Sequence, residues 1–200
     1  MPFDSVEREL RKRLDLVELS EDVLGMYPIE LSGGMKQRMV MVLSTLLNPS
    51  LLIADEITSA LDVSTQRAVA EMLVEFRDRR YVKSVIFITH DVSVLAQIAD
   101  SIMFMYAGKL AEKAPTSSII DDPKHPYSKL LLDSLPEMGV RHADKELSAI
   151  PGRPPGLLHP PEGCRFRDRC PLAIDKCLEQ PPFAEVRPSH HTACWNAEDV

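Results

Sequence analysis

The sequence lacks a long hydrophobic run, and it lacks an excess of basic residues. The longest apolar region, Met39 to Ala54, is interrupted by polar residues and a proline, so it falls short of the ~20 apolar residues of a membrane-spanning helix. The net charge is -7, which disfavours nucleic acid as a partner because phosphate backbones bind basic surfaces. The N-terminus, MPFDSVERELRKR, has no apolar signal-peptide core. A cytoplasmic location is therefore expected.

Cysteine is scarce as well, and its distribution is uneven. The four cysteines all lie between Cys164 and Cys194, after a stretch in which prolines are dense. In a cytoplasmic protein such cysteines are free thiols or metal ligands rather than disulfides. Proline-rich sequence without periodicity builds little core by itself. We therefore expect a domain over residues 1–136, a proline-rich linker over 137–163 and a cysteine-rich extension over 164–200.

The first 136 residues show alternating strand and helix patterns. The short apolar runs Leu51–Ala54 and Val85–Thr89 are bounded by turn signals, which predicts buried parallel strands. Amphipathic helices lie between and before them, and Gly108 can turn a later strand into a hairpin. The pattern predicts a layered α/β domain with a largely parallel sheet. Residues 1–48 would form its helical part and residues 49–136 its core.

Three short segments carry residues that could act on a phosphorylated ligand. Ser32 and two glycines open a helix, whose free N–H groups and positive dipole end can bind phosphate; alone, they are equally a helix cap. Asp55 and Glu56 end the first predicted strand, where carboxylates can support Mg²⁺ and orient water; alone, they read as a solvated strand end. His90 ends the next strand at the sheet edge where ligands bind; alone, it reads as a structural hydrogen-bonding residue.

Together the segments LSGGMKQR, LLIADEITSALD and ITHD closely resemble the ABC transporter ATPase family, over roughly residues 1–135. The resemblance implies a P-loop NTPase fold with ATP and Mg²⁺ as ligands. It makes Glu56 the catalytic glutamate that acts on water and His90 the switch histidine at the γ-phosphate. It places Asp55 near Mg²⁺ and Asp62 in the loop that crosses the dimer interface. The signature that contacts ATP held by a partner subunit would be Leu31, Ser32, Gly33, Gly34 and Met35.

The sequence departs from the family pattern in two ways. Ile57 stands where the family usually has a proline after the catalytic glutamate, so the following turn loses a fixed φ. In addition, no G-x-x-x-x-G-K-[ST] phosphate loop occurs in the 200 residues. The resemblance thus implies a partial domain that lacks the phosphate-loop half, and the chain alone is expected to be inactive.

The C-terminal segment shows a second resemblance. HPYSKLLLDSLP, GCRFRDRCPLAIDKC and HHTACW look like the C-terminal extension of the peptide and nickel importer ATPases. In some members of that family the cysteines hold a [4Fe-4S] cluster; four thiolates also suit Zn²⁺, and His190 or His191 could supply a ligand instead. The expected metal ligands are Cys164, Cys170, Cys177 and Cys194.

These resemblances imply an ABC importer subunit that couples ATP hydrolysis to uptake of oligopeptides or dipeptides. Its implied partners are a second ATPase subunit, as a heterodimer, two membrane permeases and, indirectly, an extracytoplasmic substrate-binding protein. The subunit would sit peripherally at the cytoplasmic face of the membrane. Nickel and oligosaccharide remain alternative substrates. The alternative function is a non-catalytic remnant that donates a signature motif or acts as a metal-binding regulatory module. A soluble ATPase of DNA repair or translation is disfavoured by the HPYSKLL segment and the cysteines.

Overall fold

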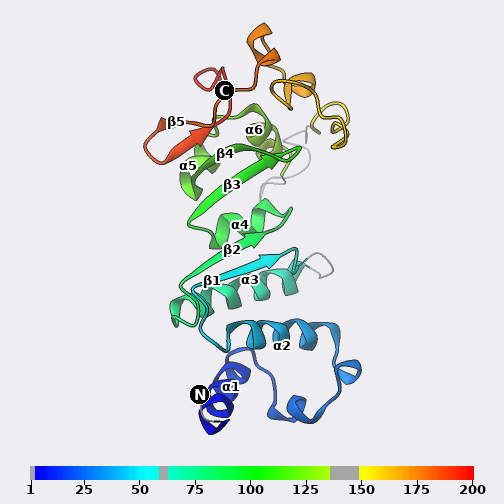
Figure 1. Ribbon diagram of the computed structural model, residues 1–200, viewed down its shortest axis with the longest axis vertical. Coiled ribbons are helices and arrows are strands. Elements are labelled where there is room, and N and C mark those ends of the chain that lie inside the picture. The colour runs from blue at the N-terminus through cyan, green and yellow to red at the C-terminus, as the bar shows by residue number, and fades with distance from the viewer. Residues whose placement is uncertain (1–2, 59–62, 136–148) are drawn as a thin grey trace, which may run out of the picture. The chain divides into compact units, whose positions relative to one another are not determined.

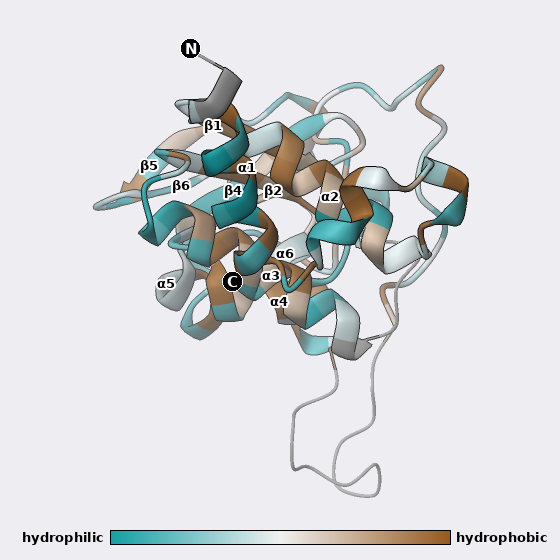
Figure 2. Ribbon diagram, turned by 90° about the horizontal axis from the view of Figure 1, so that it is seen from below, coloured by the Kyte–Doolittle hydropathy of each residue, from teal (hydrophilic) through white to brown (hydrophobic). Residues whose placement is uncertain are grey.

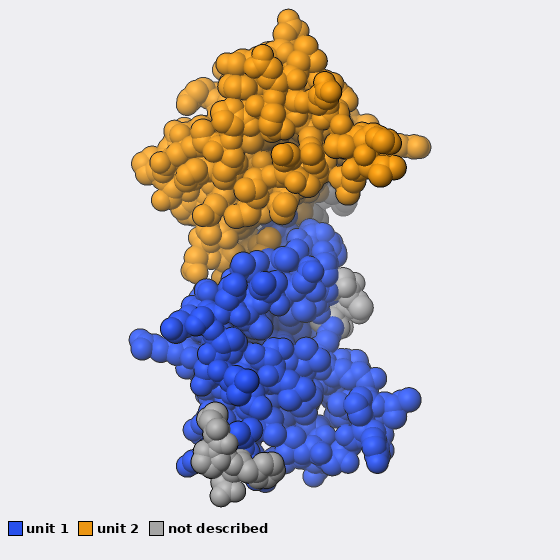
Figure 3. All heavy atoms as spheres, viewed as in Figure 1, with its two compact units in different colours: residues 1–94 blue, residues 95–200 orange. Residues whose placement is uncertain are grey.

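The computed structural model describes residues 3–58, 63–135 and 149–200. The chain divides into two compact units, residues 1–94 and residues 95–200 (Figure 3). The division falls within helix α4 (Val92–Ile98). The boundaries expected from the sequence, at 136/137 and 163/164, are therefore not those of the two units, and the first lies among residues that are not described.

Before α4, the described residues of the first unit form three α-helices, two short 3-10 helices and two strands. Their order is α1 (Phe3–Leu16), η1 (Glu21–Gly25), η2 (Pro28–Glu30), α2 (Gly33–Thr45), β1 (Leu51–Asp55), α3 (Val63–Asp78) and β2 (Ser84–Ile88). Strands β1 and β2 pair in parallel, with Asp55 opposite Ile88, and α3 lies against this pair (Figure 1). The two predicted strands are confirmed to within one residue.

The core of the first unit gathers apolar side chains from α1, α2, α3 and β1, among them Leu14, Val42, Ala54 and Phe76. The helices carry both hydrophobic and hydrophilic residues (Figure 2), as expected for helices that bury one face. The prediction of fully buried strands is wrong, because Ile53 of β1 and Ile86 of β2 are 59% and 48% exposed. The two-stranded sheet packs one face on the core, and side chains of the opposite face alternate outward.

A buried arginine joins separate segments of the first unit. Arg13 is fully buried; its guanidinium donates to Glu9 at 3.0 Å and to the Asn48 side chain at 2.5 Å. It also lies 4.1 Å from the centre of the Tyr81 ring. A buried charge is tolerated only when it is paired and hydrogen-bonded, so these contacts fix α1 against the ends of α2 and α3.

The second unit is built on an antiparallel sheet. Its elements are β3 (Ser101–Tyr106), β4 (Lys109–Pro115), α5 (Thr116–Asp121), α6 (Pro126–Asp133), η3 (Arg167–Arg169), η4 (Asp175–Leu178), β5 (Ala184–Arg187) and β6 (His190–Thr192). The β3–β4 hairpin is confirmed; it turns through Ala107 and Gly108, both with positive φ, as a two-residue hairpin turn favours.

The strand order β3-β4-β6-β5 differs from the prediction of a largely parallel sheet. Strand β6, from the C-terminal extension, pairs antiparallel with β4, with Glu112 opposite Thr192. Among the described residues only β1 and β2 form a parallel pair. The hairpin leaves one edge of β4 unpaired, and a distant segment of the chain satisfies the N–H and C=O groups of that edge.

Candidate functional site

Ser32 begins helix α2 as its N-cap. Its Oγ accepts a hydrogen bond from the Met35 N–H at 3.3 Å, which satisfies one of the free donors of the first turn. A Cβ built on Gly33 or Gly34 would meet no atom within 4 Å. The first turn of this 13-residue helix therefore faces open space, and its backbone donors fit an anionic group there.

The other signature residues anchor this turn. Leu31 is buried in the core of the first unit, and Met35 packs against the same core. A cavity of about 330 Å³ lies beside them, and its lining includes Ser32, Gly34 and Arg38. Asp62, predicted to lie at the dimer interface, falls outside the described residues.

Glu56 follows directly on strand β1 and adopts an uncommon backbone conformation. Its φ is +50°, in the left-handed region that non-glycine residues visit at a cost. The Glu56 N–H donates to the Ile88 carbonyl at 3.0 Å, which ties the residue to the end of β2. Asp55, the last residue of β1, is exposed. The end of β1 thus presents two carboxylates, one on the last strand residue, Asp55, and one on Glu56 with its left-handed backbone.

The structure brings Glu56 and His90 together. The Glu56 Oε2 lies 3.1 Å from the His90 Nδ1, although the residues are 34 positions apart. Their side chains are 44% and 69% exposed, and exposed ion pairs contribute little to stability. Because the contact contributes little to the stability of the fold, both side chains remain available to a ligand at the carboxyl ends of β1 and β2.

The four C-terminal cysteines are free thiols, of which Cys177 is buried and the other three are partly buried. The Cys164 N–H donates to the Cys177 carbonyl at 2.9 Å. Next to it, Gly163 has a φ of +72°, and a Cβ there would lie 2.5 Å from the same carbonyl oxygen, so only glycine fits. Burial, with a smaller contribution from the nearby cysteines, raises the pKa of Cys170 and raises that of Cys194 to about 11.

These thiols do not form a ready-made metal site. Across residues 3–58, 63–135 and 149–200, no group of three or more His, Cys, Asp or Glu side chains is placed to hold a metal ion. The expected [4Fe-4S] cluster or Zn²⁺ therefore has no support from the described residues.

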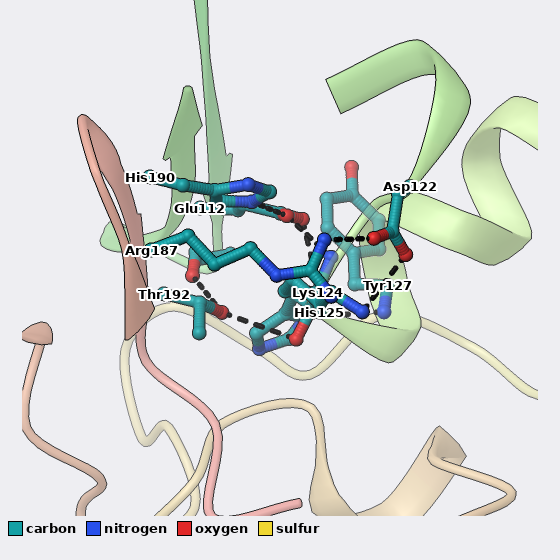
Figure 4. Close-up of polar contacts among 9 residues, drawn as sticks. Glu112, Asp122, Lys124, His125, Tyr127, Arg187, His190 and Thr192 are labelled. Carbon is teal, nitrogen blue, oxygen red and sulfur yellow. Dashed lines mark hydrogen bonds and ion pairs between the residues drawn. The ribbon is translucent and has the colours of Figure 1, made fainter. Parts of the chain in front are cut away.

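A buried polar network, which the sequence analysis missed, joins β4, β6 and the loop before α6 (Figure 4). The fully buried Glu112 carboxylate accepts hydrogen bonds from the backbone N–H groups of Lys124 at 2.5 Å and His125 at 3.1 Å. It also lies 2.6 Å from His190 Nε2. His190 is thereby engaged in the fold, which argues against its predicted alternative role as a metal ligand. The sequence around a glutamate inside a strand does not indicate that the glutamate is buried or that it contacts distant residues.

At the edge of this network, three charged side chains form a cluster, in which Lys124 is buried and Arg187 is exposed. Asp122 pairs with the Lys124 ammonium at 2.8 Å and with the Arg187 guanidinium. The hydrogen bond from Lys124 is the main reason that the pKa of Asp122 lies below its ordinary value, with Arg187 adding to it. Arg187 lies in β5, so the cluster adds a second link between the extension and the loop before α6.

The HPY segment and the first cysteine motif pack together as an aromatic cluster. Phe166, 2% exposed, lies against Tyr106 with ring centres 5.1 Å apart, against Tyr127 at 5.4 Å and against His125 at 6.0 Å. Arg169 donates to the Tyr106 hydroxyl at 3.2 Å. The motif residues that carry the second resemblance therefore fasten the extension to β3 and α6.

His125 makes the second unit sensitive to acid. Burial lowers its pKa from 6.5 to about 4, partly offset by a hydrogen bond to the Ala193 backbone. Between these two values the unfolded chain binds a proton that the folded chain excludes, so stability falls as the pH drops through this window, by roughly 3 kcal/mol from this group. His125→Asn keeps an N-cap acceptor for the Tyr127 N–H. It should flatten the dependence of the unfolding free energy on pH between 6.5 and 4.

Urea titrations monitored by circular dichroism at several pH values would measure this effect. His159→Asn, at an exposed histidine of the same unit, is the control and should leave the slope unchanged. An equal slope in the parent and in His125→Asn would contradict the assignment.

Two separate regions of the chain match known protein families. A family described as ABC transporter matches residues 4–59, and one described as Oligopeptide/dipeptide transporter, C-terminal region, matches residues 111–177. The chain is 40% identical over 197 residues to a probable peptide ABC transporter ATP-binding protein, y4tR, of Sinorhizobium fredii, covering 96% of this chain and 58% of that protein. The chain belongs to the family of peptide ABC transporter ATP-binding subunits.

Further relatives agree with this family. The chain is 43% identical over 190 residues to the dipeptide transport ATP-binding protein DppD of Caldanaerobacter subterraneus, covering 94% of this chain and 57% of that protein. Among solved structures, it resembles the ATP-binding cassette MJ0796 in a dimeric post-hydrolysis state bound to ADP and Pi, with a TM-score of 0.50 and 26% identity. That match covers 58% of this chain and 49% of the other chain. The ABC ATPase fold expected from the sequence is confirmed.

The chain spans about 57–58% of the length of these two ATP-binding subunits. Within the described part of the chain, no helix has both the length and the apolar character required to cross a bilayer.

Proposed function

We propose that the protein to which these residues belong hydrolyses ATP and couples hydrolysis to the uptake of oligopeptides or dipeptides. The observation that carries the proposal is the contact between Glu56 and His90 at the ends of two parallel strands. This edge of an α/β sheet is where ligands bind. The names of the peptide-transport relatives support the choice of substrate.

Each site residue has a proposed role. Glu56 accepts a proton from the attacking water, and His90 donates to the γ-phosphate as negative charge develops there. Asp55 supports Mg²⁺, which neutralises phosphate charge in reactions of this kind. An exposed carboxylate at a strand end fits this ion.

The signature turn acts on ATP held by a second subunit. Ser32, Gly33 and Gly34 leave backbone donors facing open space, which fits the terminal phosphate of a nucleotide carried by the partner. We therefore propose a dimer of two ATPase subunits, a heterodimer in the assembled transporter, with two permeases and, indirectly, a substrate-binding protein. The assembly would hold the subunit at the cytoplasmic face of the membrane.

The function can be tested in a chimera. The 200 residues would replace the matching part of the Caldanaerobacter DppD protein, which would be assembled with its own transporter partners. ATP-dependent uptake of a labelled dipeptide into proteoliposomes is the expected result. Uptake of Ni²⁺ in place of the dipeptide would refute the proposed substrate, and a folded chimera without ATP hydrolysis would refute the proposed activity.

The four cysteines carry a second candidate function, metal binding, which also serves the alternative of a regulatory module. Its support is the donor set itself, four free thiols within one short segment. Protein purified without oxygen should contain iron and sulfide, or about one zinc per chain. Cys177→Ser should then abolish the bound metal, while a serine at an exposed alanine, Ala184→Ser, should not. Metal-free protein whose thiols all react in the folded state would end this proposal.

A further inference from the structure

Two glutamine side chains donate hydrogen bonds to the backbone of the segment that follows Glu56. The side-chain amide of Gln37, from α2, donates to the Ile57 carbonyl at 3.0 Å. The side-chain amide of Gln66, from α3, donates to the next carbonyl, that of Thr58, at 3.1 Å. Thr58 is 2% exposed. Two consecutive carbonyls are thus fixed by donors from two different helices.

This segment needs external support. Glu56 has a left-handed backbone, and such conformations persist where the surrounding contacts over-determine them. The residue after it is Ile57, whose φ is not fixed by a ring as that of a proline would be. The hydrogen bond from Gln37 fixes the orientation of the peptide group that follows Ile57, so it restrains the turn at a point that the sequence itself leaves free.

The Gln37 side chain is partly buried, and one end of its amide lies where a polar atom is costly. Its Oε1 is buried and has no hydrogen-bond partner in the described part of the chain. A buried polar atom without a partner is costly, and an apolar side chain of similar size would avoid that cost but lose the donor. The bond to Ile57 offsets part of the cost.

We propose that Gln37 is a positioning residue, which links the signature helix to the catalytic glutamate. Gln37 lies in the second turn of α2, two residues after the Met35 N–H that Ser32 caps. A displacement of the signature turn by a nucleotide would therefore move the Ile57 carbonyl and, through it, the backbone of Glu56 and the contact with His90. The role in hydrolysis rests on the proposed function; the positioning itself does not.

The positioning can be measured in the 200-residue chain without nucleotide. Gln37→Met and Gln37→Glu both remove the donor, one with an apolar and one with a charged side chain. Both should speed hydrogen exchange of the Glu56 N–H roughly tenfold, since a net hydrogen bond contributes on that order, and both should shift the His90 ring resonances. Lys36→Met, at an exposed neighbour on α2, should do neither.

Two results would overturn the positioning role. One is unchanged Glu56 exchange in both Gln37 variants; the other is equal acceleration in Lys36→Met, which would indicate general loosening of the helix. In the chimera, Gln37→Met should lower kcat roughly tenfold and leave KM for ATP within about twofold, because the bond orients the base and does not contact ATP. An inactive parent chimera with altered exchange would refute the proposed function alone.

Discussion

Glu56→Gln in the chimeric ATPase should slow ATP hydrolysis by roughly 10²–10⁴-fold, the range typical of a lost general base, while ATP binding is retained. The amide keeps the size of the side chain and can still orient the water, but it cannot accept a proton as the transition state forms. The variant should therefore trap ATP in a closed dimer. Steady-state phosphate release and nucleotide trapping after gel filtration would measure both effects.

The neighbouring residues provide matched comparisons. His90→Ala should lower turnover and spare ATP binding, because its contact matters most once charge develops on the γ-phosphate. Asp55→Asn should change the dependence on Mg²⁺ as well as turnover. Glu71→Gln, at an exposed glutamate of α3 that pairs with Arg67, should hydrolyse ATP at the parent rate. Parent rates in both Glu56→Gln and His90→Ala would refute the assigned site, provided that the same changes in the partner subunit are also silent.

Glu112→Ala should destabilise the second unit by about 3–5 kcal/mol, because removing one partner leaves the remaining groups of a buried network unsatisfied. The change leaves His190 buried without its carboxylate and leaves the N–H groups of Lys124 and His125 without their acceptor. Because His190 begins β6, the extension should detach from β4 before the unit unfolds. Urea unfolding monitored by fluorescence of Trp195 would give the stability.

Limited trypsin digestion would test the order of events. Cleavage after Lys113, which lies opposite His191 of β6, should become faster in Glu112→Ala than in the parent. Glu112→Gln keeps an acceptor for the backbone donors and should lose less stability. Glu162→Ala, at an exposed glutamate, should change stability by no more than about 0.5 kcal/mol. A loss below about 1 kcal/mol for Glu112→Ala would contradict a structural role for this network.

The sequence by itself determined the local elements and most of the candidate site. Apolar runs between turn signals located β1 and β2, and the serine with two glycines located the start of α2, because caps and strand ends depend on neighbours in the sequence. The ends of two strands also located Glu56 and His90, since the carboxyl ends of parallel strands meet at one edge of a sheet. The spacing of these segments was specific enough to indicate the ABC ATPase family.

Only the tertiary structure decided how distant segments meet. The addition of β6 to β4, the contact between Glu112 and His190 across 78 positions and the bond from Gln37 to Ile57 have no local signal. Each depends on which donors and acceptors the packed elements leave unsatisfied, and burial forces those groups to find partners wherever the fold supplies them. The tertiary structure also decides that one face of β1 and β2 is exposed, because an apolar strand is buried only where another layer covers it.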